Sequence, residues 1–550
     1  MKRWKHCYGM VGMALLFPAW LAAQDELIIE PPTDPNTFLN RQIEEDVNRP
    51  PGRVYVLRRN GIYLWNAFLT NNGWVLRIKA EDGPGQKPVI YLITDPATGT
   101  FPTHFIEMGE DVYLKDIILV GFIESLPDQI ANNPPRLIRS RAAGFDLILD
   151  GCILTQSRGE HIRLEQATRV VKITNCIFAN MGDLGTSNLG AGKPIDFRNA
   201  SCDSAIFINN TFVNFHDRVV RHRASVAAIN YFIFDHNTVV NSLGFHGTLA
   251  LGWLGRECRI TNNLFVDHFI AGADTDRTRQ AEFEEPGEMD PRNGLGRMAW
   301  VLSVPNDTTH WVVKGNYYTV SPEVQAFYDR HAAEGVLGEG PPLTHHICRR
   351  LGADSSMAFI KEAIELANRP RPMVNMAEWY RDPNGGNKTK NTPTPKWVRE
   401  LHDYDRRPWQ YFADTLDCSY STSTAAYTGA VGGFPAGDLN WFPDKKSQWE
   451  AWVTAVEQKA EVPAEFGLLQ NYPNPFNPTT KIRFRLDRPE QVTLSVYDLQ
   501  GRRVRTLVSG RLEAGSHEVT FDASGLPSGV YVYKLSAGSR ETVRKMVLVR

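Results

Sequence analysis

Arginine residues recur in the middle of the chain at comparable places in successive short segments of β-strand pattern. The segments align on one apolar residue each, and these residues are Ile138, Ile162, Ile195 and Val220. Because side chains alternate along a strand, the residues that follow point to the opposite face. One outward column is then Arg139, Arg163, Asp196 and Arg221, and the next is Arg141, Glu165, Arg198 and Arg223. Six guanidinium groups and two carboxylates on adjacent strands predict a locally positive patch of sheet.

This charge pattern suits an acidic polysaccharide, because a planar guanidinium pairs bidentately with carboxylate or sulfate. In β-elimination from a uronide, a base removes the proton at C5 while a cation stabilises the enolate-like intermediate. The candidates for catalysis are Arg221, Arg223, Arg198 and Arg163. The candidates for substrate binding are Arg139, Arg141, Glu165 and Asp196, with His161 and His246 beside the patch. The first hypothesis is therefore a polysaccharide lyase.

Two alternatives explain the same residues. A non-catalytic surface protein, either glycan-binding or adhesive, would use the patch for binding alone. An inert solenoid would carry a cross-coil ladder of Arg–Asp and Arg–Glu pairs that only balances charge on a solvated sheet. Both alternatives stay open at the level of the sequence.

Calcium is the one cofactor that the sequence suggests. The insertion at residues 271–297 holds several carboxylates, whose oxygens Ca²⁺ prefers as ligands, and Asp274 and Asp276 are the candidate ligands. The ligand spacing of an EF-hand loop is absent, so a solvated acidic loop is the alternative. Further insertions at residues 124–135 and 182–194 precede strands of the arginine patch. They predict walls of a cleft, since loops that rise from a rigid sheet commonly border a binding site.

A short repeat positions these strands. A polar residue, usually Asn, is followed by residues that are mostly β-formers, and the unit begins at Asp116, Gly151, Asn175, Asn210, Asn237, Asn263 and Asn316. The steps between these positions are 35, 24, 35, 27, 26 and 53 residues. A base period of about 25 with insertions predicts a solenoid of β-strands, because one unit cannot bury its own apolar face. Asn suits a sharp turn, and its amide can hydrogen-bond to the equivalent Asn one coil away.

This repeat resembles the right-handed parallel β-helix of the pectate-lyase-like superfamily, which implies an all-β solenoid over residues 24–320. Residues 232–238 (FIFDHNT), 259–268 (RITNNLFVDH) and 312–318 (VVKGNYY) look like the WIDH, SNNxFxxH and VNNYY segments of pectate lyases. That resemblance implies a Ca²⁺ ligand at Asp235. The family's RxPxxR segment, which carries the catalytic arginine, is replaced here by DPRNGLGR at residues 290–297. The paired-Asp motifs of polygalacturonases are absent, which disfavours a two-carboxylate hydrolase.

An irregular and helical wrap is expected to follow the solenoid over residues 321–459. Helical periodicity appears at residues 323–333, 356–368 and 448–459, between loops rich in Pro and Trp. Such a wrap would cover an open end of the solenoid. Trp441 and Phe442 are expected to pack back on the solenoid.

The two ends of the chain carry export features. Residues 1–23 are expected to be a signal peptide, because Lys2, Arg3 and Lys5 precede an apolar run that ends before Ala22-Ala23. That run is too short to cross a bilayer comfortably, so the mature chain is expected to have no integral membrane segment. Lys plus Arg total 60 and Asp plus Glu total 62, a balance that does not point to nucleic acid as a partner.

After a linker at residues 460–466, residues 467–550 are expected to form a small separate β-sandwich. Alternating strand patterns lie at residues 481–486, 492–498, 517–522, 529–535 and 542–549. The segment closely resembles the C-terminal sorting domain of cargo of the bacterial type IX secretion system, through YPNPFNPTT at residues 472–480 and GLPSGVY at residues 525–531. The resemblance implies the type IX machinery as a partner and delivery to the cell surface or the medium. A carbohydrate-binding sandwich is the alternative.

Two cysteines are expected to lie one above the other in the solenoid. Cys152 and Cys176 occupy the same position in adjacent coils. Stacked small apolar side chains are one interpretation, and a disulfide in an oxidising compartment is the other.

Overall fold

The structure is a computed structural model that describes residues 25–121, 133–182, 189–281, 301–302, 308–338, 343, 345–386, 388, 416–460, 466–471, 473–513 and 515–549. Within these ranges the chain forms two compact units, one up to residue 446 and one from residue 447 onward. The first unit contains the candidate functional site and is described first.

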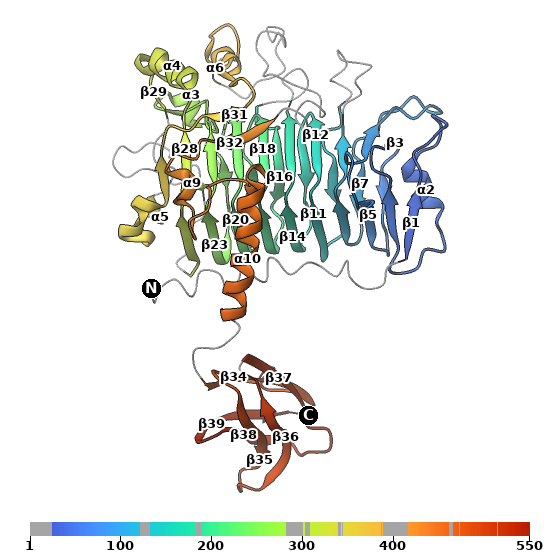
Figure 1. The fold of residues 1–550 in the computed structure, drawn as a ribbon, viewed down its shortest axis with the longest axis vertical. Coiled ribbons are helices and arrows are strands. Elements are labelled where there is room, and N and C mark those ends of the chain that lie inside the picture. The colour runs from blue at the N-terminus through green and yellow to red at the C-terminus, as the bar shows by residue number, and fades with distance from the viewer. Residues whose placement is uncertain are drawn as a thin grey trace. The chain divides into compact units, whose positions relative to one another are not determined.

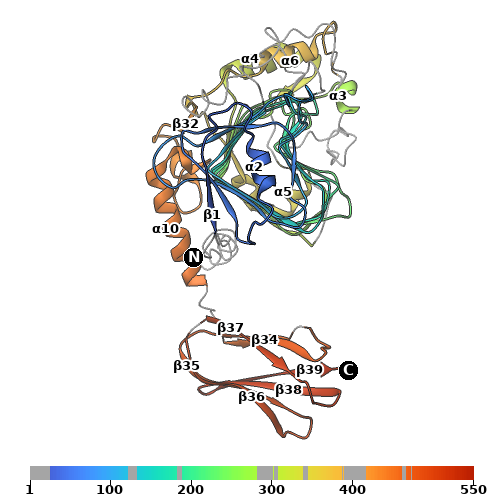
Figure 2. The same ribbon diagram turned by 90° about the vertical axis from the view of Figure 1, so that its right-hand side faces the viewer.

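The first unit is a parallel β-helix built from three sheets, which confirms the predicted fold class. Each coil contributes in turn one strand to a ten-stranded sheet A, one to a ten-stranded sheet B and, in most coils, one to an eight-stranded sheet C. Strands of the same sheet lie side by side along the solenoid in Figure 1. The view along the solenoid in Figure 2 shows the coils superimposed around a closed cross-section.

Sheet A consists of β1 (Glu26–Ile29), β2 (Val54–Leu57), β5 (Leu76–Ala80), β8 (Val112–Lys115), β11 (Phe145–Asp150), β14 (Thr168–Thr174), β17 (Cys202–Ile208), β20 (Ile229–Asp235), β23 (Leu254–Thr261) and β27 (His310–Lys314). Sheet B consists of β3 (Ile62–Trp65), β6 (Val89–Leu92), β9 (Ile118–Val120), β12 (Ile153–Ser157), β15 (Ile177–Met181), β18 (Thr211–Phe215), β21 (Thr238–Ser242), β24 (Leu264–Val266), β28 (Asn316–Thr319) and β30 (Phe359–Lys361). Sheet C consists of β4 (Leu69–Thr70), β7 (Ile106–Met108), β10 (Ile138–Ser140), β13 (Glu160–Arg163), β16 (Lys193–Arg198), β19 (Val220–His222), β22 (Leu249–Ala250) and β26 (Val301–Leu302).

The interior of the solenoid is filled by stacked apolar side chains, one layer per coil. Phe178, Phe212, Phe234 and Phe265 form one such stack, with successive ring centroids 5.2, 5.9 and 6.5 Å apart. These distances lie within the range of favourable aromatic pairs. Since each ring contacts the ring of the next coil, the alternation of apolar residues in sequence sets the register of the whole stack.

The turn between sheets A and B has two successive positions with different roles, and the sequence repeat treated them as one position. A left-handed residue with positive φ comes first, at Asp116, Gly151, Asn175, Asn209, His236, Asn262 and Gly315. The next residue lies inside the turn, where Asn210, Asn237, Asn263 and Asn316 form a ladder of amides. Asn210 therefore aligns with Cys176 rather than with Asn175, and the predicted alignment was wrong by one residue from there on.

The two cysteines precede the asparagines at the second turn position. The backbone N–H of Cys152 donates to Sγ of Cys176 at 3.3 Å, and both side chains are free thiols. Of the two interpretations of this pair, stacking is confirmed.

Both ends of the solenoid are covered. Helix α2 (Leu39–Glu45) buries Leu39 and Ile43 against the first coils. At the other end, Ile347 of helix α5 (His345–Leu351) belongs to the same core. Figure 1 places these two helices at opposite ends of the solenoid. These caps protect the outermost coils from pairing with another chain.

The solenoid continues further than predicted. Strand β30 pairs in parallel with β28, so sheet B extends beyond residue 320. The helical periodicity at residues 356–368 was misleading, because this stretch holds β30 and β31 (Leu366–Asn368) after a short 3₁₀ helix. Pairing with an existing sheet edge overrides local helical preference. Strand β31 pairs with β32 (Asp417–Tyr420).

The other two predicted helices, at residues 323–333 and 448–459, are present. Helix α4 (Pro322–His331) packs with α6 (Val374–Arg381) in a second apolar cluster. Strand β29 (Val336–Gly338) pairs with β25 (Ala273–Asp274), which is followed by α3 (Arg277–Ala281). Helix α10 (Pro443–Ala460) covers the predicted helix at residues 448–459.

The closing segment, residues 416–442, packs on the outer face of sheet B and includes the short helices α9 (Ala426–Gly429) and η5 (Leu439–Trp441). Trp441 donates from Nε1 to Thr211 Oγ1 at 2.8 Å, and Phe442 joins the same apolar cluster, as predicted. Asp438 is buried here, where its carboxylate accepts from Thr211 Oγ1 at 2.8 Å and from the backbone of Asn440 at 2.9 Å. Burial raises the pKa of Asp438 to about 7, although these hydrogen bonds and Lys446 act in the opposite direction.

The raised pKa of Asp438 predicts that the solenoid unit loses stability as the pH rises. The pKa of Asp438 is higher in the folded state than in the unfolded state, so its protonated form stabilises the fold. This stabilisation is fully present below about pH 4 and is lost as the pH rises through about 7. Between pH 5 and pH 8.5 the loss should be about 3 kcal/mol. Asp438→Asn keeps a neutral side chain at every pH, so its free energy of unfolding in urea should not show this loss. Parallel pH profiles of the two proteins would contradict the prediction.

The second unit carries a β-sandwich of two antiparallel sheets, as predicted. One sheet has β33 (Gly467–Leu468), β34 (Thr479–Leu486) and β37 (Gly515–Asp522), and the other has β35 (Glu490–Tyr497), β36 (Arg503–Leu512), β38 (Gly529–Ala537) and β39 (Arg540–Leu548). Strand β36 was not predicted. Its many exposed polar residues hide the alternation that marks the other strands. In the described part of the chain, no helix combines the length and the apolar character needed to cross a membrane.

Candidate functional site

The arginine patch forms on the outer face of sheet C in the predicted register. Ile138 pairs with Ile162, Ile162 with Ile195, and Ile195 with Val220, and all four side chains are buried in the solenoid. The residues that follow them are therefore neighbours on the outer face, in the order Arg139, Arg163, Asp196 and Arg221.

Ion pairs connect this column across the coils. Arg139 Nη2 lies 3.3 Å from Glu165, and Arg163 Nη2 lies 3.0 Å from the other oxygen of Glu165. Arg141 Nη1 lies 3.1 Å from Glu107, a carboxylate on β7 that the sequence analysis did not include. The cross-coil ladder is therefore real.

Arg221 is held by Asp196. Its Nη1 lies 3.1 Å from Asp196 Oδ2, and the side chain of Arg221 is only 7% exposed beside a fully buried Asp196. Both groups thus belong to the rigid part of the face. Arg221 was the first candidate for a catalytic base, but its guanidinium already binds a buried carboxylate, so it is poorly placed to accept a proton.

A bulge displaces the second predicted column. The register of β16 and β19 shifts between Asp196 and Arg198, where Arg198 has a φ of 52°. Arg198 therefore pairs with His222 and not with Arg223. The bulge leaves Arg198 on the outside, with 38% of its side chain exposed, and Arg223 is exposed just beyond the end of β19. A bulge commonly re-aims a side chain in this way.

Three charged or titratable side chains meet around a fourth, Asp217, near the starts of the sheet C strands. Asp217 is fully buried, and its carboxylate lies 2.7 Å from His246 Nδ1, 3.0 Å from Arg218 Nε and 3.6 Å from Lys193 Nζ. Burial acts to raise the pKa of Asp217, but Arg218, His246 and Lys193 together hold it well below its ordinary range. We call these four residues the Asp217 cluster.

The Asp217 cluster is linked to the arginine patch through Glu160. Glu160 Oε1 lies 3.9 Å from Lys193 Nζ, and its Oε2 lies 3.9 Å from Arg163 Nη1. Because an ionised carboxylate only accepts, the hydrogen shared by His246 and Asp217 resides on His246 Nδ1. In a neutral imidazole, the lone pair is then on Nε2. Sequence analysis placed His246 beside the patch but missed its partners. The adjacent charged residues Asp217 and Arg218 were the feature of the sequence that could have pointed to the cluster.

His161 was predicted to lie beside the patch, but the structure places it elsewhere. It is fully buried in the solenoid and stacks on Phe178 at 5.8 Å between ring centroids. Burial lowers the pKa of His161 to about 3. His161 and Ile162 are both fully buried although they are consecutive in β13, so His161 is a core residue.

The three predicted calcium ligands do not come together. Asp235 is buried in a turn, where it accepts from Thr261 Oγ1 at 2.6 Å and Asn262 Nδ2 at 2.8 Å. Asp274 forms a buried ion pair with Arg381, and Asp276 lies 3.3 Å from Lys388. Among the residues that the structure describes, no group of three or more His, Cys, Asp or Glu side chains could hold a metal ion. These carboxylates already have protein partners, so they do not fit the predicted calcium site.

The predicted cleft walls fall largely outside the described residues. The residues outside the described ranges are 124–132, 183–188 and 282–297 of the three insertions. The stretch DPRNGLGR at residues 290–297 is among them. The described site is therefore the face of sheet C with the Asp217 cluster.

The three parallel sheets and the antiparallel terminal sheets define a parallel β-helix protein with a C-terminal β-sandwich. Residues 470–549 match the family described as the secretion system C-terminal sorting domain. The protein is thus directed by type IX secretion to the cell surface or the extracellular space, and the type IX machinery is its partner. A comparison with curated proteins found no match to the chain.

Proposed function

We propose that the outer face of sheet C binds an acidic polysaccharide at the cell surface or in the medium. The observation that carries this proposal is the surplus of cations on a rigid face. Six guanidinium groups, those of residues 139, 141, 163, 198, 221 and 223, lie on this face with four carboxylates, those of residues 107, 160, 165 and 196. A polyanion laid across the coils would compensate the remaining charge.

The exposed arginines are the groups that a polymer reaches first. Arg141 is 56% and Arg198 is 38% exposed, and Arg223 is also exposed. Adjacent coils are about 4.8 Å apart, so these side chains lie along the solenoid rather than at one point. The ion-paired Arg221 and Asp196 beneath them hold the backbone of the face in place. This arrangement favours an extended ligand.

Retention on immobilised polysaccharide tests the proposal. The purified protein should be retained by at least one of pectate, alginate and sulfated glycosaminoglycan, and salt should weaken retention by screening. The double variant Arg198→Ala/Arg223→Ala should bind about 10-fold more weakly or worse. Arg256→Ala, an exposed arginine on sheet A, is the matched control and should bind normally. Equal binding by both variants, or no salt-sensitive retention on any of the three polymers, would refute the proposal.

Cleavage by β-elimination is the second candidate function, and the pair of His246 and Asp217 favours it. In this reaction the base takes the C5 proton, the electron pair forms the C4–C5 double bond, the C4–O bond breaks, and the leaving oxygen takes a proton from solvent water. The candidate base is His246, whose ring Asp217 orients, although its side chain is only 4% exposed. Lys193 and Arg218 supply positive charge at the other oxygen of the same carboxylate.

Absorbance of the new uronate double bond decides between cleavage and binding alone. A rise that is lost in His246→Ala, with retention on the polymer unchanged, would establish a lyase with its base at His246. Addition of a chelator should leave this rise unchanged, since the proposed step uses only protein side chains and solvent water. Retention without any rise would establish a binding protein.

A further inference from the structure

A groove lies on the outer face of sheet B, on a different sheet from the arginine patch. Ile118, Ile153 and Ile177 form its floor, and they pair with one another on three consecutive coils. In the next coil the same column continues with Thr211, which is covered by the closing segment. The groove therefore lies where the closing segment stops covering an apolar column, and its volume is about 570 Å³.

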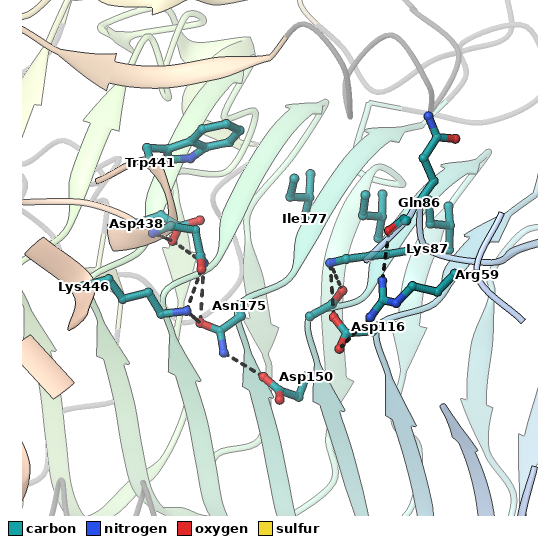
Figure 3. Close-up of a pocket in the computed structure, with 15 residues that line it drawn as sticks. Arg59, Gln86, Lys87, Asp116, Asp150, Asn175, Ile177, Asp438, Trp441 and Lys446 are labelled. Carbon is teal, nitrogen blue, oxygen red and sulfur yellow. Dashed lines mark hydrogen bonds and ion pairs between the residues drawn. The ribbon is translucent and has the colours of Figure 1, made fainter. Parts of the chain in front are cut away.

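One end of the groove is formed by the closing segment. The hydrogen bond from Trp441 Nε1 to Thr211 fixes the orientation of the half-buried indole ring. Lys446 Nζ lies nearby and donates to Asn175 Oδ1 at 2.8 Å and to Asn440 Oδ1 at 2.7 Å. Figure 3 shows Trp441 and Lys446 on one side of Ile177. An aromatic ring held in place before binding loses little entropy when a ligand packs on it.

The opposite end and the rim are polar. Lys87 and Arg59 lie 3.5 and 3.9 Å from the carboxylate of Asp116. Figure 3 shows them across the groove from Lys446. Between the two ends, Asp150 Oδ1 accepts from Asn175 Nδ2 at 2.7 Å, so a carboxylate and an amide lie side by side on the rim.

The charges that line the groove nearly balance. The cations are Arg59, Lys87 and Lys446, and the carboxylates are Asp116, Asp150 and Asp438. This balance disfavours a polyanion, in contrast to the face of sheet C. A fully apolar ligand is also disfavoured, because it would cover six ionisable groups without hydrogen-bonding to them. Strands β9, β12 and β15 are paired on both sides, so the groove offers no open backbone edge to a peptide strand.

We propose that this groove binds an uncharged oligosaccharide, independently of the acidic polysaccharide proposed for sheet C. The faces of sugar rings that carry C–H groups pack on Trp441 and on the isoleucine floor. The hydroxyl groups hydrogen-bond to the carboxylates, amides and lysines of the rim. The column of isoleucines along the solenoid suits an extended chain of several sugar units.

Isothermal titration calorimetry of the full-length protein with cellohexaose, xylohexaose and laminarihexaose tests this proposal. At least one should bind, and Trp441→Ala should weaken binding about 10-fold. Tyr231→Ala removes a half-buried aromatic side chain on sheet A and should leave binding unchanged. Asp150→Ala changes the rim without touching the closing segment, so a loss of affinity there supports the site even if Trp441→Ala unfolds.

The test also separates this site from the sheet C proposal. Arg198→Ala/Arg223→Ala should bind the uncharged hexasaccharide as tightly as the unmodified protein. Binding of none of the three sugars at millimolar concentration would overturn the proposal. Unchanged affinity in both Trp441→Ala and Asp150→Ala would do the same. Self-association that is abolished by Trp441→Ala would instead identify the groove as an interface between two copies of the chain.

Discussion

Replacement of Asp217 by Ala is expected to lower the free energy of unfolding of the solenoid unit by about 3–5 kcal/mol, the usual cost of removing one partner from a buried ion pair. Asp217 is fully buried and is the common partner of Lys193, Arg218 and His246. Without it, Lys193 keeps Glu160 at 3.9 Å, whereas Arg218 loses its neighbouring carboxylate. Urea unfolding of the two proteins at pH 7 measures the difference.

Asp203→Ala is the matched control, because Asp203 is an exposed carboxylate on sheet A and accepts from Asn230 at 3.0 Å. This substitution should change stability by about 0.5 kcal/mol or less. The effect of Asp217→Ala should also depend on pH. The folded-state pKa of Asp217 is depressed, so its contribution is present above about pH 4 and is lost as the pH falls further. A loss below about 1 kcal/mol at pH 7 would mean that Asp217 does not hold the cluster together.

Replacement of Asn237 by Ala is expected to cost at least about 3 kcal/mol, because three buried polar groups lose their partner and each costs about 1–3 kcal/mol. Asn237 Oδ1 accepts from the backbone of Asn210 at 3.1 Å and from its side chain at 2.9 Å. Asn237 Nδ2 donates to the backbone carbonyl of Phe207 at 3.0 Å. The large cost follows from the full burial of Phe207, Asn210 and Asn237 in the middle of the ladder.

The earlier coils provide a second variant at this position. Cys152 and Cys176 stand where later coils have Asn, so Asn237→Cys tests size and hydrogen bonding separately. It should be more stable than Asn237→Ala and less stable than the unmodified protein. Asn230→Ala, on the outer face of sheet A, is the control and should have little effect. If Asn237→Ala unfolds at the same urea concentration as Asn230→Ala, the amide ladder is not a source of stability.

Much of the fold could be predicted because the solenoid repeats one local rule. The inward residues Ile138, Ile162, Ile195 and Val220 are apolar in each coil, and the reverse register would bury arginine. One coil pairs only with its neighbours, so a correct local alignment carries over to the sheet. The arginine column of sheet C was predictable for this reason. The sorting domain was predictable from its turn motifs.

The sequence by itself therefore determined the parallel β-helix, the order of the outer column on sheet C and the exported sandwich. Only the tertiary structure decided the bulge that shifts Arg198 out of register with Arg223, the burial of His161, and the meeting of Lys193, Asp217 and His246. It also decided that Trp441 borders the groove, although Trp441 is more than 200 residues away in sequence from the isoleucines of the floor. The physical reason is that the strand period constrains residues within a strand, whereas bulges, corners and loops of unequal length bring distant residues together through packing alone.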